Sequence, residues 1–158
     1  MSDASESPSS PTPVHVSERT IDGPSATDCI IRSAKLQDCA IEDAKLSDVQ
    51  FKRITLDDVG FEEAQFHNVA MPQSQWRDVS LKAATMTDVT LEQVTLRDVN
   101  MTHATLQDVD LSDSVLTDVS LRNVVITDAD ITGLVIDGHA IDALIADAIA
   151  RAKSAGQP

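Results

Sequence analysis

The sequence predicts an all-β solenoid that ends in an α-helix. Between residues 29 and 138 a large apolar residue recurs at every fifth position, and all 22 of these positions from Ile31 to Ile136 are apolar. Small or β-branched residues stand two places earlier, with Ser74 and Ser114 as polar exceptions. Beyond residue 138 the apolar spacing changes to that of a helix.

A period of five follows from the geometry of a short strand and a turn. Side chains of an extended chain alternate sides, so an apolar residue, an outward residue and a second apolar residue form one inward-facing edge. Two further residues turn the corner. A helix does not fit, because five residues advance about 500° and would spread the apolar side chains around the cylinder. Since one such unit cannot bury its own apolar face, neighbouring units must stack.

The repeat resembles that of the pentapeptide-repeat family, whose consensus centres on Leu or Phe with a small residue two places before it. Residues 89–98 and 99–108 carry this pattern without interruption. The resemblance implies a right-handed four-sided β-helix with four pentapeptides in each coil. We therefore expect about 5.5 coils, which form a rod roughly 26 Å long at a layer spacing of about 4.8 Å.

The composition is that of one soluble domain with an aliphatic core. The chain has 158 residues, of which 42% are hydrophobic and 3% aromatic. No run approaches the length of a membrane span, and the acidic N-terminus is unlike a signal peptide, so we expect a cytoplasmic location. The expected divisions are a disordered tail over 1–13, a capping segment over 14–27, the repeat region over 28–138, a helix over 139–153 and a short tail over 154–158.

The predicted helix has one apolar face, and two roles for this face are open. It caps the last coil of its own chain, pairs with a second copy or does both, since some members of the family that the repeat resembles dimerise through C-terminal helices. The residues of this apolar stripe are Ile141, Leu144, Ile145, Ala148 and Ile149.

Aspartate recurs every ten residues from Asp28 to Asp128, with Asn68 as the exception. Ten residues are half of a 20-residue coil, so these side chains are expected on opposite edges. One interpretation is structural, with corner carboxylates that accept hydrogen bonds from backbone N–H groups. A calcium site is the alternative, although the calcium-binding β-rolls are Gly-rich and this chain has five glycines. We expect no metal and no other cofactor.

No catalytic site is predicted. The sequence contains no discernible Ser–His–Asp grouping, Gly-rich phosphate loop or CxxC pair. Cys29 and Cys39 occupy inward positions ten residues apart, so we expect reduced thiols on opposite walls of the core. The four histidines fall in unrelated registers of the repeat and are expected to be solvated: His15, His67, His103 and His139.

The formal net charge of −14 disfavours direct binding to nucleic acid, which needs clustered Lys and Arg. We expect instead a non-enzymatic scaffold that presents a rigid acidic surface to a basic protein partner. The resemblance adds a sharper alternative, because some pentapeptide-repeat proteins mimic B-form DNA and occupy the DNA-binding saddle of DNA gyrase, which confers quinolone resistance. On this hypothesis the partner-binding carboxylates are Asp88, Asp98, Asp108, Asp110, Asp118, Asp128 and Asp130.

Overall fold

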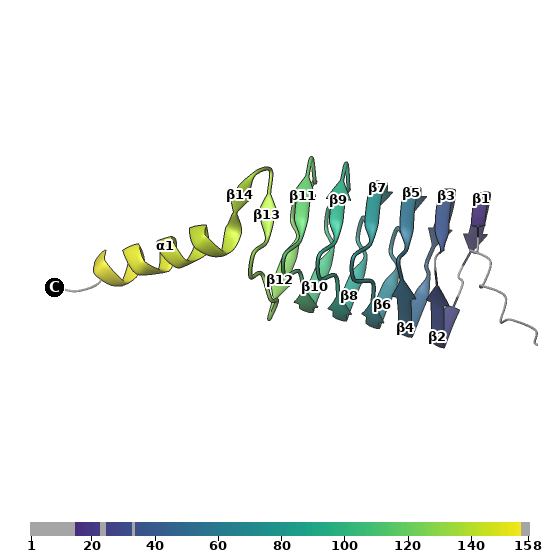
Figure 1. The fold of residues 1–158 in the computed structure, drawn as a ribbon, viewed down its shortest axis with the longest axis horizontal. Coiled ribbons are helices and arrows are strands. Elements are labelled where there is room, and N and C mark those ends of the chain that lie inside the picture. The colour runs from purple at the N-terminus through teal and green to yellow at the C-terminus, as the bar shows by residue number, and fades with distance from the viewer. Residues whose placement is uncertain (1–14, 23–24, 33, 156–158) are drawn as a thin grey trace, which may run out of the picture.

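The protein is a β-solenoid followed by one helix (Figure 1). A computed structural model describes residues 15–22, 25–32 and 34–155. The predicted fold class, a four-sided β-helix with a C-terminal α-helix, is confirmed. The tail expected over 1–13 lies outside the described residues.

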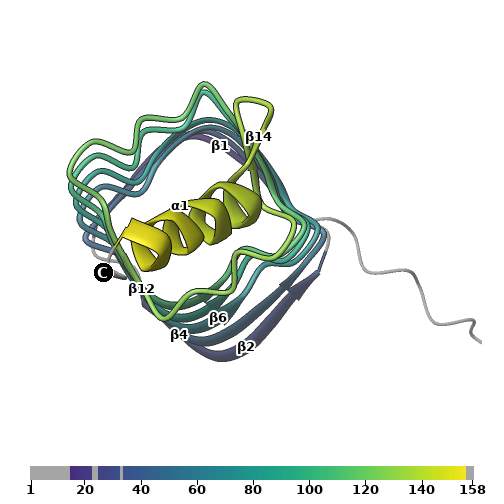
Figure 2. The same ribbon diagram turned by 90° about the vertical axis from the view of Figure 1, so that its left-hand side faces the viewer.

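Two sheets form opposite walls of the coil (Figure 2). All neighbouring strands in them are parallel except β13 and β14, which pair antiparallel. The first sheet contains, in spatial order, β1 (His15–Asp22), β3 (Lys35–Glu42), β5 (Thr55–Gly60), β7 (Gln75–Ser80), β9 (Thr95–Arg97), β11 (Val115–Thr117), β13 (Val135–Ile136) and β14 (His139–Ala140). The second contains β2 (Ser25–Arg32), β4 (Lys45–Lys52), β6 (Gln65–Ala70), β8 (Thr85–Thr90), β10 (Thr105–Asp110) and β12 (Val125–Thr127).

The register between strands confirms the 20-residue coil. Leu56 pairs with Trp76, and Trp76 pairs with Leu96 in the next strand of the same sheet. The two walls without long strands are also hydrogen-bonded from coil to coil, since the Phe61 N–H donates to the Ser80 carbonyl at 2.7 Å. Backbone groups on all four sides are therefore satisfied by the neighbouring coil, as a buried chain requires.

The inward positions predicted from the repeat form one continuous core. Side chains numbered with a final 1, 4, 6 or 9 are buried through most of the solenoid. The two polar exceptions are compensated locally, because the Ser74 hydroxyl donates to the Met71 carbonyl at 2.7 Å and the Ser114 hydroxyl to the Leu91 carbonyl at 2.7 Å. Burial therefore costs these hydroxyls no hydrogen bond.

Trp76 is the largest side chain of the core. It is 2% exposed, between two smaller leucines in its column. Its indole nitrogen is the one buried side-chain N or O atom of the described residues that has no hydrogen-bond partner. The ring therefore contributes apolar contact area but leaves one donor unsatisfied.

The ends of the solenoid differ from the expected divisions in detail. β1 pairs with β3 in the 20-residue register, so coil geometry already begins within the segment expected as a cap. At the other end, β13 and β14 form a hairpin that includes Gly138 at φ +79°. The helix α1 (Ile141–Ala155) starts after this hairpin and projects away from the last coil (Figures 1 and 2).

Candidate interaction surfaces

Every fifth residue at the corners of the coils has a left-handed backbone. From Asp38 to Gly133 the residues numbered with a final 3 or 8 have φ between 50° and 70°. Among residues with a Cβ atom, Asp and Asn adopt this conformation most readily. The backbone therefore favours aspartate at these corners, although the corner residues numbered with a final 3 share the conformation and are mostly of other types.

The corner aspartates form two separate ladders because a coil has 20 residues. Successive members of a ladder lie in neighbouring coils, which are about 4.8 Å apart. The ladder on the first sheet contains Asp38, Asp58, Asp78, Asp98 and Asp118, and the ladder on the second contains Asp48, Asn68, Asp88, Asp108 and Asp128.

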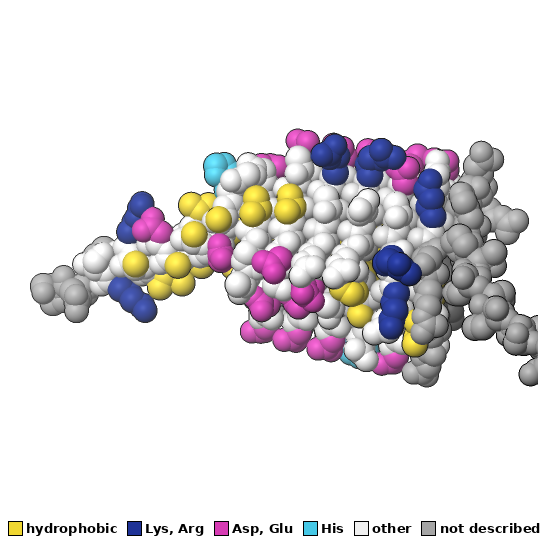
Figure 3. All heavy atoms as spheres, viewed as in Figure 1, with side chains coloured by type: hydrophobic (Ala, Val, Ile, Leu, Met, Phe, Trp, Pro, Cys, Tyr) yellow, Lys and Arg dark blue, Asp and Glu magenta, His cyan; other side chains and the backbone are white. Residues whose placement is uncertain are grey.

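The structure brings five of the seven predicted partner-binding residues to one edge. Asp110 and Asp130 are paired side by side in neighbouring coils. They follow Asp108 and Asp128 of the second ladder by two residues. Asp98 and Asp118 belong to the opposite ladder. Acidic side chains run in a row along the lower edge of the solenoid in Figure 3. We call Asp88, Asp108, Asp110, Asp128 and Asp130 the C-terminal acidic edge.

Hydrogen bonding differs between the members of this edge. The Ser112 N–H donates to Asp110 at 2.9 Å, and the Thr132 N–H donates to Asp130 at 2.9 Å. The backbone and side chain of Thr132 hold the pKa of Asp130 below its ordinary value. In the described part of the chain, the ladder aspartates accept no backbone N–H. Backbone conformation, rather than the expected hydrogen bonds, therefore explains their position.

Negative charge is concentrated in the last coils. Residues 100–140 contain seven acidic and one basic residue, whereas residues 34–99 contain twelve acidic and seven basic. At about 4.8 Å per coil, residues 100–140 carry one net negative charge per about 1.6 Å of the solenoid axis, and residues 34–99 carry one per about 3.2 Å. B-form DNA carries one per about 1.7 Å. The C-terminal coils therefore approach the linear charge density of a duplex.

The helix α1 is anchored at its first turn and exposed beyond it. The Ile141 N–H donates to the Leu134 carbonyl at 3.0 Å, and the Gly133 N–H donates to the Asp142 carboxylate at 3.0 Å. Of the predicted apolar stripe, Ile141 is partly buried against the core and Ala148 is exposed. Leu144, Ile145 and Ile149 are 54%, 44% and 50% exposed. The described structure therefore leaves most of this apolar face uncovered.

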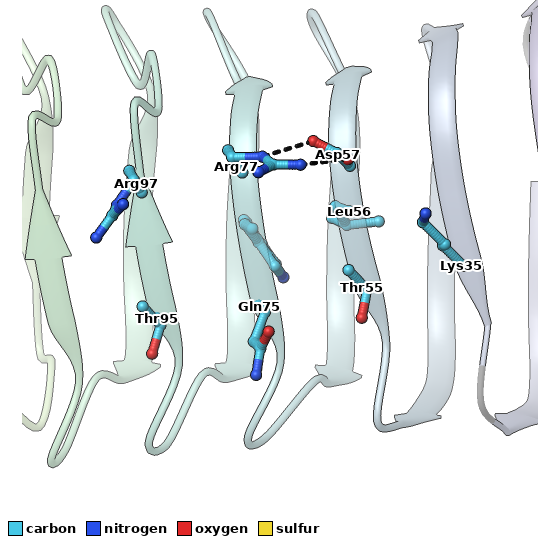
Figure 4. A pocket seen from close by; sticks show the side chains of 9 residues that line it. Lys35, Thr55, Leu56, Asp57, Gln75, Arg77, Thr95 and Arg97 are labelled. Atoms are coloured by element: carbon cyan, nitrogen blue, oxygen red, sulfur yellow. Dashed lines mark hydrogen bonds and ion pairs between the residues drawn. The ribbon is translucent and has the colours of Figure 1, made fainter.

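Sequence reasoning missed a basic groove on the outer face of the first sheet. Lys35, Arg77 and Arg97 line it, on β3, β7 and β9 (Figure 4). Arg77 forms a bidentate pair with Asp57, with nitrogen–oxygen distances of 2.8 and 2.6 Å. The spacing of 20 residues between the two arginines was a signal in the sequence, because it places them in adjacent strands.

Within residues 15–22, 25–32 and 34–155, no group of three or more His, Cys, Asp or Glu side chains is arranged to hold a metal ion. No helix in this part of the chain combines the length and apolar character needed to cross a membrane.

Comparison with known proteins identifies the repeat. A sequence model of the pentapeptide repeat region matches residues 44–121. The solved structure of Rfr23, a pentapeptide repeat protein from the cyanobacterium Cyanothece 51142, matches with a TM-score of 0.56 and 15% identity, covering 72% of this chain and 91% of that chain. This similarity concerns the fold.

Two further solved structures match at lower TM-scores. A pentapeptide repeat protein from the Arabidopsis thaliana thylakoid lumen has a TM-score of 0.41 and 16% identity, with 53% of this chain and 62% of that chain covered. QnrB1, a plasmid-mediated fluoroquinolone resistance protein, has a TM-score of 0.38 and 12% identity, with 86% and 89% covered. No curated protein matches the sequence.

Proposed function

Because the chain belongs to the pentapeptide-repeat family, we propose that it is a non-enzymatic scaffold whose C-terminal acidic edge binds a basic surface of a partner protein. The observation that carries this proposal is the concentration of negative charge on a rigid set of coils. Rigid presentation matters, because side chains already held in place lose little conformational freedom on binding.

The geometry of the edge favours a partner with regularly spaced cations. Its carboxylates repeat once per coil, about 4.8 Å apart, and the left-handed backbone at each ladder position fixes the direction in which the side chain points. Complementary charge also accelerates encounter with a basic partner, and this acceleration falls as salt is added. Salt-sensitive binding is therefore the signature of the proposed function.

DNA mimicry is the more specific form of this proposal, with DNA gyrase as a partner. The supporting observation is the net charge per length of the last two coils, which is close to that of duplex DNA. In this form of the proposal the opposite ladder contributes Asp98 and Asp118, so that acidic groups face two walls of a basic groove.

Pairing of two copies through α1 would lengthen the acidic rod. Leu144, Ile145 and Ile149 expose apolar surface on a helix that projects from the last coil, and a second copy offers the same surface in return. We therefore favour dimerisation over capping within one chain as the role of the apolar stripe.

Inhibition of DNA supercoiling by DNA gyrase tests the specific form. The full chain is titrated into the reaction at several salt concentrations, and we expect inhibition that weakens steeply as salt rises. Absence of inhibition at micromolar protein would remove gyrase as the partner. Inhibition that is insensitive to salt would contradict binding through the acidic edge.

A further inference from the structure

The basic groove on the first sheet is a second surface, separate from the acidic edge. Its volume is about 490 Å³, and it extends over four successive strands from β3 to β9. Figure 4 shows its side chains on these strands, with Arg77 turned toward Asp57. The outward residues that line it are Lys35, Thr55, Asp57, Gln75, Arg77, Thr95 and Arg97.

Two of the three cations in the groove form no ion pair with the described residues. The Asp57 side chain, which is 17% exposed, holds the guanidinium of Arg77 through two hydrogen bonds. These bonds lower the pKa of Asp57 and raise that of Arg77, so both remain charged and cancel. Neither Lys35 nor Arg97 forms an ion pair with another described residue. The groove thus has an excess of two positive charges in a chain of net charge −14.

We propose that this groove binds an extended acidic segment of a partner protein, with one carboxylate on Arg97 and another on Lys35. An Arg guanidinium binds a carboxylate through two parallel hydrogen bonds, and a Lys ammonium provides a compact charge. Between these two anchors, Thr55 and Gln75 offer neutral polar groups to the backbone of the segment.

Strand spacing defines the pattern of acids that the groove recognises. Lys35 and Arg97 are three strands apart, which corresponds to about 14 Å along the solenoid axis. Four residues of an extended chain span about 13 to 14 Å. The columns of Lys35 and Arg97 are also offset by two residues along the strand, so the best-matched segment carries Asp or Glu at two positions four or five residues apart, with uncharged residues between them.

The surroundings of the groove favour a short acidic segment over nucleic acid. The first ladder, with Asp58, Asp78 and Asp98, runs along the same strands or directly beside them. The Asp78 carboxylate lies 4.0 Å from Arg77. A long polyanion would have to pass this row of like charges, whereas a peptide anchored at two points stays within the groove.

Peptide binding to the full chain tests the proposal. The probe is a fluorescein-labelled heptapeptide, Gly-Glu-Ser-Gly-Ser-Glu-Gly, and the readout is fluorescence anisotropy at about 20 mM salt. We expect the Lys35→Gln/Arg97→Gln variant to bind about tenfold more weakly than the natural chain. The matched variant Lys82→Gln/Arg122→Gln removes the same charge from exposed sites elsewhere and should bind within about twofold of it.

Three results would overturn the proposal. One is an equal loss of peptide binding in both variants, which would show that the peptide is attracted by the overall charge of the protein and not by the groove. Another is a lack of any difference between the peptide and its version with Gln in place of both Glu residues. The third is tighter binding of a labelled single-stranded oligonucleotide that the peptide does not displace. Circular dichroism melting of each variant establishes that the fold is intact.

Discussion

At the scale of single residues, the acidic ladders are a compromise between backbone conformation and charge repulsion. The left-handed corners favour Asp, but neighbouring carboxylates about 4.8 Å apart repel each other by roughly 3 kcal/mol at an effective dielectric of 20 and by under about 1 kcal/mol in water. Asn68 shows how this repulsion is relieved, because its amide donates to the Asp48 carboxylate at 2.6 Å. An amide at a corner keeps the conformation and adds a hydrogen bond.

Asp108→Asn should therefore stabilise the protein. Asp108 stands between Asp88 and Asp128 in its ladder, so the substitution removes two repulsive neighbours and supplies an amide donor. We expect a gain of about 0.5–1.5 kcal/mol in the free energy of unfolding at low salt. The gain should shrink at 1 M salt, where the screening length is about 3 Å. Urea unfolding at both salt concentrations measures it.

Asp113→Asn is the matched control for this substitution. Asp113 has the same left-handed backbone, with φ of 53°, but its column neighbours are Gln93 and Gly133. Its replacement should change stability little. Equal gains at both positions, or a gain at Asp108 that does not depend on salt, would show that ladder repulsion is not the cause.

The buried position of Trp76 predicts its fluorescence. Because the ring is 2% exposed and is the chain's one tryptophan, iodide should barely quench emission from the native protein. Quenching should appear after unfolding in urea. Native quenching close to that of free tryptophan would place the ring outside the core.

At the scale of elements, the Asp142 side chain helps to hold α1 to the solenoid, beside the backbone hydrogen bond from Ile141 to Leu134. The Asp142 carboxylate accepts the Gly133 N–H at 3.0 Å and the Ala143 N–H at 2.7 Å. These two backbone hydrogen bonds hold the pKa of Asp142 below its ordinary value of 3.8. A carboxyl whose pKa is lower in the folded state stabilises the fold above its unfolded pKa, and this contribution is lost as the pH falls through the folded value.

The contribution of Asp142 should consequently be visible at pH 7 and absent in strong acid. We expect Asp142→Asn to lower the melting temperature at pH 7. The difference from the natural chain should shrink as the pH falls below about 4 and the carboxyl becomes protonated. Thermal melts of both proteins across this range measure the effect, and a difference that stays constant with pH would contradict it.

The apolar stripe of α1 should control the oligomeric state. Leu144→Asp/Ile149→Asp places charges where the proposed second copy packs, so we expect a monomer where the natural chain is a dimer. Ala143→Asp/Ala150→Asp adds the same charges on the opposite face of the helix and should leave the dimer intact. Sedimentation equilibrium distinguishes these outcomes. A monomeric natural chain at about 100 μM would refute dimerisation through α1.

The elements also show where sequence reasoning succeeds and where it stops. The core was predictable, because a strict period of five allows only one set of inward positions, and even Ser74 and Ser114 occupy them. The direction of α1 was not, because an amphipathic stripe looks the same whether it covers the last coil or projects from it. Its start also shifted, since His139 and Ala140 form a strand with β13.

The sites were predictable only where their residues occupy the same position in successive repeats. A spacing of ten or twenty residues led to the aspartate ladders. The basic groove was missed because Lys35 stands in a different outward column from Arg77 and Arg97. Its shape depends on how strands from separate coils lie side by side, which the local pattern around any one residue does not reveal.

At the scale of the whole molecule, charge is distributed unevenly along the rod. The C-terminal coils are strongly acidic, whereas the groove over β3 to β9 holds a local excess of positive charge. The two proposed surfaces therefore lie on opposite sheets, overlap only near β8 and β9, and attract partners of opposite charge. A scaffold of this kind is able to hold two partners at a fixed separation.

A competition assay, in which two charge-matched variants displace duplex DNA from DNA gyrase, tests whether the C-terminal acidic edge mimics DNA. One variant carries Asp→Asn at all five positions of the C-terminal acidic edge. The other neutralises five exposed carboxylates near the opposite end, with Asn at the aspartates and Gln at the glutamates: Asp38, Asp43, Asp58, Glu62 and Glu63.

We expect the natural chain and the second variant to displace DNA, and the first variant to fail although circular dichroism shows that it is folded. Equal loss in both variants would show that overall charge suffices for displacement. That outcome, or failure of the natural chain to displace DNA at low salt, would contradict a DNA-mimicking acidic edge.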